Sequence, residues 1–123
     1  MNNNKIEEAV EVMYQEVKRL NGQVLFDELE DVVEGIIPVK GEYCFSHPDN
    51  ENYIFWVNVS QEFIMALMDL ANKPDISMRE TFLYNYASAK KFPNLRPTQT
   101  IKSDEARKNP KKPIWVPMAF YLK

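Results

Sequence analysis

The chain has 123 residues, 45% of them hydrophobic and 27% charged, and its formal net charge is −3 at pH 7. This length and composition are typical of one globular domain, so we expect a single domain over residues 1–123 and exclude wholesale disorder. The only cysteine, Cys44, excludes an internal disulfide. The polar N-terminus and the short apolar runs favour a cytoplasmic protein and argue against secretion or insertion into a membrane.

The first predicted elements are two helices. Apolar residues at steps of three and four predict an amphipathic helix over 5–20, with a left-handed stop at Asn21. A cap pattern, Asp27 followed by Glu30, predicts a short second helix that ends before Pro38. The apolar stripe of the first helix predicts either packing on the domain's own core or a homodimer contact.

A β-hairpin and two more helices are predicted next. From Tyr43 to Val59 the apolar residues recur at every second position on either side of a polar turn, which predicts two antiparallel strands. Ser60 is the expected N-cap of a helix over 61–72. Ser77, with Glu80 three positions later, predicts a further helix running to about residue 91.

The last third of the chain predicts a long surface loop and a closing strand. Residues 93–113 are rich in proline, polar residues and lysine, whereas residues 114–122 alternate as a strand does. Pro117 lacks an N–H donor and favours an edge position or a bulge in that strand. The predicted fold class is therefore α+β: a small antiparallel sheet, made of the hairpin and the C-terminal strand, covered by about four helices.

Charge is divided unequally along the chain. Residues 1–60 contain 4 Lys and Arg against 12 Asp and Glu, whereas residues 61–123 contain 11 against 6. This division steers encounters with charged partners. Eight basic residues lie close together in sequence: Lys90, Lys91, Arg96, Lys102, Arg107, Lys108, Lys111 and Lys112. Four acidic residues form the predicted docking face of the second helix: Asp27, Glu28, Asp31 and Glu34.

No motif in the sequence predicts catalysis, a cofactor or a metal. Cys44 and His47 supply one Cys-x-x-His pair without a second pair, which is too few ligands for a structural zinc site. The single histidine lacks the partners of a catalytic triad, and the glycines occur singly, so no loop cradles a phosphate.

The predicted function is non-enzymatic binding of a protein partner, as an adaptor or inhibitor. The first alternative is a nucleic-acid-binding module that uses the basic segment 90–112 and stacks bases on flanking aromatic residues, Trp115 among them. The net charge of −3 and the pI of about 5.2 count against it. A small enzyme with an unrecognised carboxylate site is the other alternative. Small accessory proteins of phages and mobile elements often combine these features, but this general similarity does not identify a family.

Overall fold

A computed structural model describes residues 3–123 of the chain. Its elements, in chain order, are α1 (Asn3–Leu20), β1 (Val24–Leu25), α2 (Phe26–Val33), β2 (Lys40–His47), β3 (Asn50–Val59), α3 (Gln61–Ala71), β4 (Ile76–Glu80), the 3-10 helices η1 (Leu83–Tyr86) and η2 (Thr98–Thr100), α4 (Asp104–Lys108), β5 (Ile114–Trp115) and β6 (Met118–Leu122). The fold is α+β, as the sequence predicts. The described residues form two three-stranded sheets where one sheet was expected.

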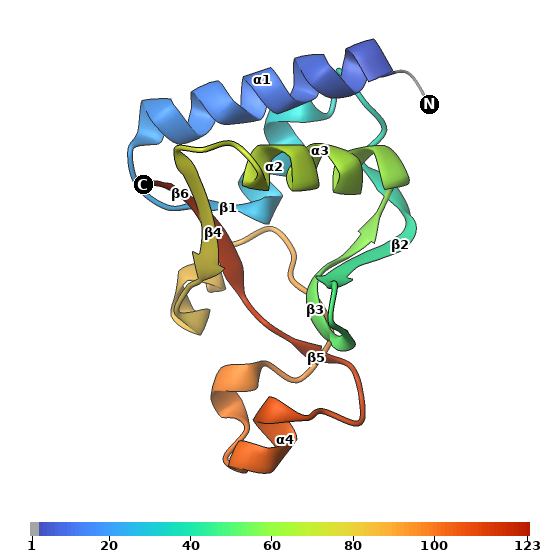
Figure 1. The fold of residues 1–123 in the computed structure, drawn as a ribbon, viewed down its shortest axis with the longest axis vertical. Helices are drawn as coiled ribbons and strands as arrows, with labels where there is room; N and C mark the ends of the chain where they lie inside the picture. The colour runs from blue at the N-terminus through green and yellow to red at the C-terminus, as the bar shows by residue number, and fades with distance from the viewer. Residues whose placement is uncertain (1–2) are drawn as a thin grey trace.

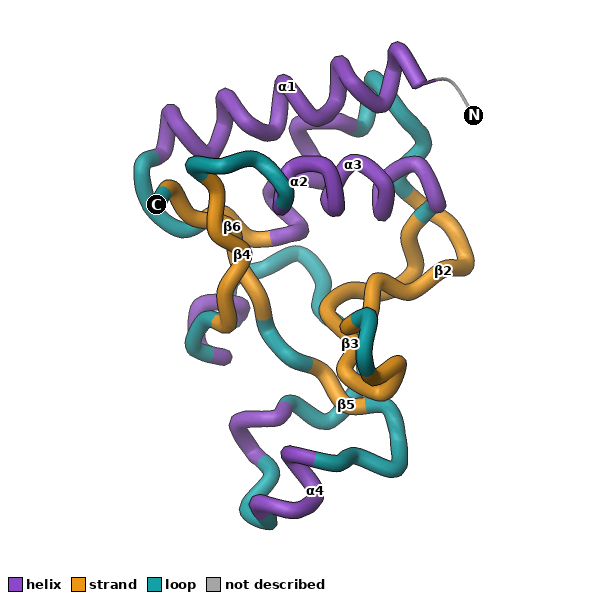
Figure 2. Tube along the Cα trace, in the orientation of Figure 1, coloured by secondary structure: helices purple, strands orange, loops and turns teal. Residues whose placement is uncertain are grey.

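The helices and sheets lie in successive layers. The long helix α1 crosses one end of the molecule, with α2 and α3 beneath it and the strands beyond them (Figure 1). The lobe, defined as residues 96–113, projects from the opposite end and contains η2 and α4 (Figure 2). Within residues 3–123, no helix is both long and apolar enough to cross a bilayer.

The predicted first and third helices are confirmed. The apolar stripe of α1 is buried, with Met13 and Val17 fully inside, so that stripe packs on the protein's own core. Asn21 ends α1 with a positive φ of 48°, the left-handed stop that the sequence indicates. At the start of α3, Oγ of Ser60 accepts a hydrogen bond from the backbone N–H of Phe63 at 3.0 Å.

The predicted hairpin is confirmed, but the predicted C-terminal strand is split between the two sheets. β2 and β3 pair antiparallel, and β5 pairs with β3 in parallel, with Ile54 opposite Trp115. β6 instead lies between β1 and β4, antiparallel to both. The change of sheet falls at Pro117, which has no N–H to donate while its carbonyl accepts from the N–H of Thr81 at 2.9 Å.

The helix predicted from Ser77 to about residue 91 is wrong. Residues 76–80 form β4 instead, with Ser77 opposite Tyr121 and Glu80 opposite Met118 in β6. A local cap pattern is worth about 1 kcal/mol, which the hydrogen bonds and side-chain contacts of strand pairing exceed. Only η1 remains helical in this stretch, and it is a short 3-10 turn.

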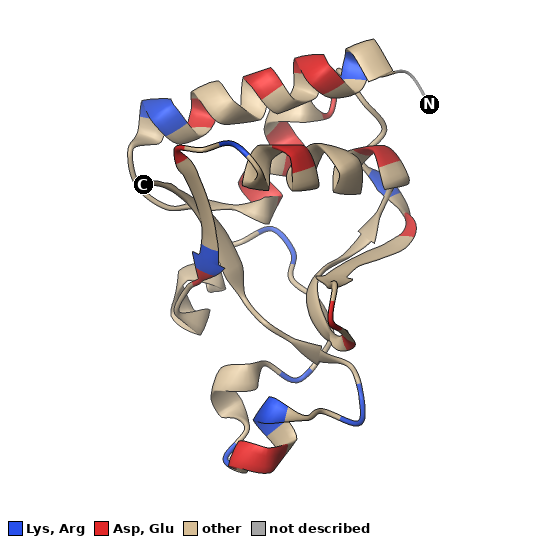
Figure 3. Ribbon diagram, in the orientation of Figure 1, with Lys and Arg blue, Asp and Glu red and all other residues tan. Residues whose placement is uncertain are grey.

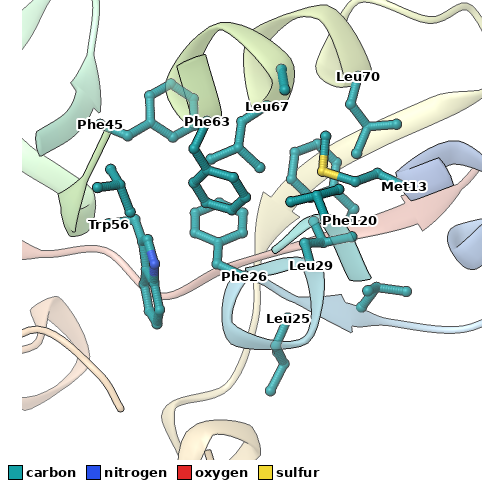
Figure 4. Packing of buried hydrophobic residues seen from close by; sticks show 14 of the residues in the cluster. Met13, Leu25, Phe26, Leu29, Phe45, Trp56, Phe63, Leu67, Leu70 and Phe120 are labelled. Carbon is teal, nitrogen blue, oxygen red and sulfur yellow. The ribbon is translucent and has the colours of Figure 1, made fainter. Parts of the chain in front are cut away.

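The core is built around aromatic rings that join the two sheets to the helices. Phe26, at the start of α2, packs edge-on against Trp56 of β3 with ring centroids 5.6 Å apart, and its ring lies 5.5 Å from that of Phe120 in β6 (Figure 4). Such contacts add to the free energy gained by burying the rings. Phe26 thereby links both sheets at one point.

Candidate functional site

The acidic helix α2 presents only part of its charge to solvent. Asp31 and Glu34 are exposed, but Asp27 is 9% exposed and does not lie on the docking face predicted for it. One oxygen of Asp27 accepts the backbone N–H of Lys90 at 3.3 Å. Glu28 caps the helix by accepting the N–H of Leu25 at 3.2 Å, and burial raises the pKa of its carboxyl.

Two acidic residues of α2, the exposed Asp31 and the partly buried Glu30, pair with the first two residues of the basic segment. Nζ of Lys90 lies 2.8 Å from Oδ2 of Asp31, and Nζ of Lys91 lies 2.7 Å from Oε2 of Glu30. The hydrogen bond with Asp31 raises the pKa of Lys90. Glu30 also accepts a hydrogen bond from the indole Nε1 of Trp56 at 2.6 Å. The two oppositely charged sequence segments therefore partly neutralise each other within the molecule.

The remaining basic residues lie on the lobe. Arg96 donates to the carbonyl of Thr100 at 3.3 Å, and Arg107 pairs with Asp104 one turn earlier in α4. Four exposed lysines make no ion pair with any residue in the described part of the chain: Lys102, Lys108, Lys111 and Lys112. Figure 3 shows basic residues along the lobe, where α4 also carries acidic ones.

The lobe is held against the hairpin by hydrogen bonds. The hydroxyl of Tyr53 donates to the carbonyl of Arg107, and Nδ2 of Asn52 donates to the carbonyl of Pro110 at 2.9 Å. Ser103 caps α4 by accepting the N–H of Ala106 at 3.3 Å. The predicted loop thus contains short helical turns and is hydrogen-bonded to β3.

Trp115, predicted to contact a partner or a nucleic acid, is 1% exposed. Phe92 stacks over it with centroids 5.9 Å apart and planes at 9°, and Phe92 is itself 56% exposed. The ring offered to solvent here is therefore that of Phe92. The indole N–H of Trp115 is buried but has a hydrogen-bond partner, because it donates to the carbonyl of Phe55 at 3.3 Å.

Two more aromatic residues are exposed close by. Phe82 and Tyr84 are 67% and 71% exposed, and their rings stack with centroids 5.7 Å apart. Tyr84 lines a groove of about 350 Å³, and the ring of Phe82 stacks on Tyr84 next to it. We call it the aromatic groove, and its main lining residues are Leu83, Tyr84, Tyr86, Phe92, Leu95 and Trp115.

The exposed rings of Phe82 and Tyr84 were not predicted, because the cap pattern at Ser77 predicts a helix through both residues. A signal was present in their spacing, since Phe82, Tyr84 and Tyr86 occupy alternate positions. In a helix Tyr84 would point away from Phe82 and Tyr86, whereas in an extended segment the three would share a face. In the structure Phe82 and Tyr84 are exposed but Tyr86 is buried, so the spacing does not identify which of these rings reach solvent. The structure brings Tyr84 together with Phe92, eight positions later, only because the chain turns after η1.

The residues weighed as metal ligands do not converge. Cys44 is exposed, and Nδ1 of His47 accepts the backbone N–H of Asp49 at 3.0 Å. Across residues 3–123, no three His, Cys, Asp or Glu side chains form a group that could hold a metal ion.

Comparison with known proteins gives no match to this chain among family models, curated proteins or solved structures.

Proposed function

We propose that this protein binds another protein, as an adaptor or an inhibitor of a larger partner, and that the aromatic groove is its contact surface. The observation that carries this proposal is the exposure of Phe82, Tyr84 and Phe92 at 67%, 71% and 56%. Clustered apolar surface of this kind marks interaction sites, and Tyr, Trp and Phe are enriched in the centres of protein interfaces.

The groove supports the proposal because its floor is held in place. The hydroxyl of Tyr86 donates to the carbonyl of Met118 at 2.7 Å, and burial raises the pKa of Tyr86, which keeps that donor protonated. The indole of Trp115 is likewise hydrogen-bonded. A preformed floor loses little conformational freedom on binding, and its apolar faces accept an apolar anchor side chain from the partner.

Charge next to the groove defines the partner further. Arg96 is exposed and lies between Leu95 and Pro97, which both line the groove. The unpaired lysines of the lobe continue this positive region along the chain. The partner segment is therefore one that carries an aliphatic or aromatic anchor flanked by acidic residues, because charge complementarity favours that arrangement.

The test is an affinity pull-down from the native cells with the unaltered chain and with the double variant Tyr84→Ser/Phe92→Ser. A single protein recovered in stoichiometric amount, with or without nuclease, and lost with the double variant is the expected result. Each aromatic anchor removed should weaken binding by roughly tenfold or more.

Met68→Ser is the matched control, because Met68 is 50% exposed but lies on α3, away from the groove. It should retain the partner. Recovery that depends on intact nucleic acid, or that survives the double variant and is lost with Met68→Ser, would contradict the proposal.

A further inference from the structure

We propose that a second site, the cleft between the two sheets, binds a small organic carboxylate with an apolar or aromatic body. The cleft has a volume of about 480 Å³, within the range of small-molecule sites. It is separate from the aromatic groove, with which it shares no lining residue. The inference therefore does not depend on the proposed protein partner.

The walls of the cleft come from three parts of the fold. Tyr53 and Phe55 of β3 line one side, and Met118 of β6 lines the other. The lobe closes the third side with Thr98 and Arg107. Sites of this kind occur where separate elements meet, because apolar walls and polar groups from distant segments converge there.

His47 lines the cleft and carries a hydrogen-bond donor. Its Nδ1 accepts the backbone N–H of Asp49 at 3.0 Å, so the neutral ring carries its proton on Nε2. The ring is held edge-on against Tyr53 and Phe55, with centroids 6.1 Å and 6.0 Å away. Its orientation is thus set before any ligand binds.

Arg107 supplies the positive charge. The hydroxyl of Tyr53 holds the carbonyl of Arg107 in place, while the guanidinium pairs with Asp104 through Nη2. This pair lies at the surface of α4 and contributes little to stability, so the remaining N–H groups can bind an incoming carboxylate.

Thr98 supplies a polar group without a partner. Thr98 lines the cleft and is 8% exposed, and its buried Oγ1 makes no hydrogen bond with any part of the described chain. A buried hydroxyl without a partner is costly and rare in native structures. Rotation of the Thr98 side chain toward the cleft would let a ligand oxygen accept from Oγ1 and would remove that cost.

Gln99 and Glu80 decide which end of the cleft takes the negative charge. Nε2 of Gln99 donates to Glu80 at 3.1 Å and to the carbonyl of Thr81 at 2.6 Å, so this amide braces the wall. The carboxylate of Glu80 repels an anion from its side. The ligand carboxylate therefore belongs with His47 and Arg107, and its apolar body lies between Phe55 and Met118.

Arg107 is the one cationic side chain that lines the cleft within residues 3–123, which favours a monoanion over a phosphate ester.

The test is a titration of the labelled protein with 2-naphthoate, followed by amide chemical shifts. Saturable one-to-one binding is expected, with the largest shifts at Phe55, Thr98 and Val116. The uncharged probe 2-naphthamide should bind roughly tenfold or more weakly, because it cannot form charge-assisted hydrogen bonds with Arg107.

Two variants locate the site. Arg107→Gln and the nearly isosteric Thr98→Val should each weaken naphthoate binding several-fold, whereas Lys108→Gln, next to Arg107 but outside the cleft, should not change it. The amide spectra of the free variants show whether the lobe stays folded. Naphthamide binding as tight as naphthoate, shifts centred on Tyr84 and Phe92, or no saturation with either probe would overturn the inference.

Discussion

At the scale of single residues, one hydrogen bond ties α1 to the turn between α3 and β4. The hydroxyl of Tyr14 donates to Oδ2 of Asp75 at 2.5 Å, and the amino groups of Lys18 and Lys73 lie over the Tyr14 ring at 5.0 and 4.8 Å. The hydrogen bond stabilises the ionised carboxylate, so the pKa of Asp75 is lowered and that of Tyr14 is raised.

This pair predicts a specific loss of stability in acid. Because the pKa of Asp75 is lower in the folded than in the unfolded chain, its contribution is present above the unfolded pKa and is lost as pH falls through the folded pKa. We expect the Tm to fall less between about pH 5 and pH 2 in Tyr14→Phe than in the unaltered protein. Calorimetry across that range measures the difference. Asp69→Asn, an exposed acid of α3, should keep the full dependence, and an unchanged slope in Tyr14→Phe would contradict the prediction.

Residues whose role depends on a distant partner could not be predicted from local patterns. The buried positions of α1, such as Met13, follow from periodicity alone. Asp27 is predicted to lie on the surface because acidic side chains are usually exposed. In the structure it is buried and accepts a hydrogen bond from the backbone N–H of Lys90, which is 63 positions later in the chain. No spacing rule relates residues that far apart.

At the scale of elements, β2 begins with a close approach of two backbones at Gly41. A Cβ at this position would lie 2.5 Å from the carbonyl oxygen of Val59 and 2.8 Å from Cα of Ser60. The contact is tight because the N–H of Ser60 donates to the carbonyl of Val39 at 2.7 Å, just before β2. Only glycine fits without a backbone shift.

Gly41→Ala should therefore lower the free energy of unfolding by about 1–3 kcal/mol, the usual cost of overpacking. Gly35→Ala is the matched control, since no atom lies within 4 Å of its added Cβ. That variant should be neutral or more stable by up to about 1 kcal/mol. Urea denaturation of both variants gives the comparison, and equal stabilities would show that the start of β2 moves freely.

Elements with a strong local signal were predictable, whereas their pairing was not. The helical periods of α1 and α3 and the alternation through β2 and β3 are properties of neighbouring residues. The division of residues 114–122 between two sheets depends instead on Pro117 and on its contact with Thr81, which belongs to another part of the chain. The same contact between distant segments makes residues 76–80 a strand despite their cap pattern.

For the whole molecule, acidic and basic residues that are far apart in the sequence lie partly side by side in the fold. Lys90 and Lys91 fold back onto Asp31 and Glu30, and Arg107 pairs with Asp104. The basic segment is visible in the sequence. Which of its residues lack an ion pair, and are therefore available to a partner, depends on tertiary contacts that the sequence does not show. The aromatic groove depends on folding as well, because η1 and Phe92 meet only after the turn between them.

Internal pairing limits how this protein can bind single-stranded nucleic acid. On the lobe, the four lysines without an ion pair in the described part of the chain are left to contact phosphates, together with Arg96 and the free N–H groups of Arg107. Each phosphate contact contributes about −0.7 to the slope, so log affinity for a labelled oligo-dT should change with log salt at a slope no steeper than about −4. The net charge of −3 makes that binding weak at physiological salt.

Fluorescence anisotropy over a salt series measures the slope, and replacing all four lysines by Gln should flatten it while the Tm stays nearly unchanged. A steeper slope would mean that Lys90 and Lys91 leave their acidic partners to bind phosphate, and the nucleic-acid alternative would then displace the protein partner proposed above.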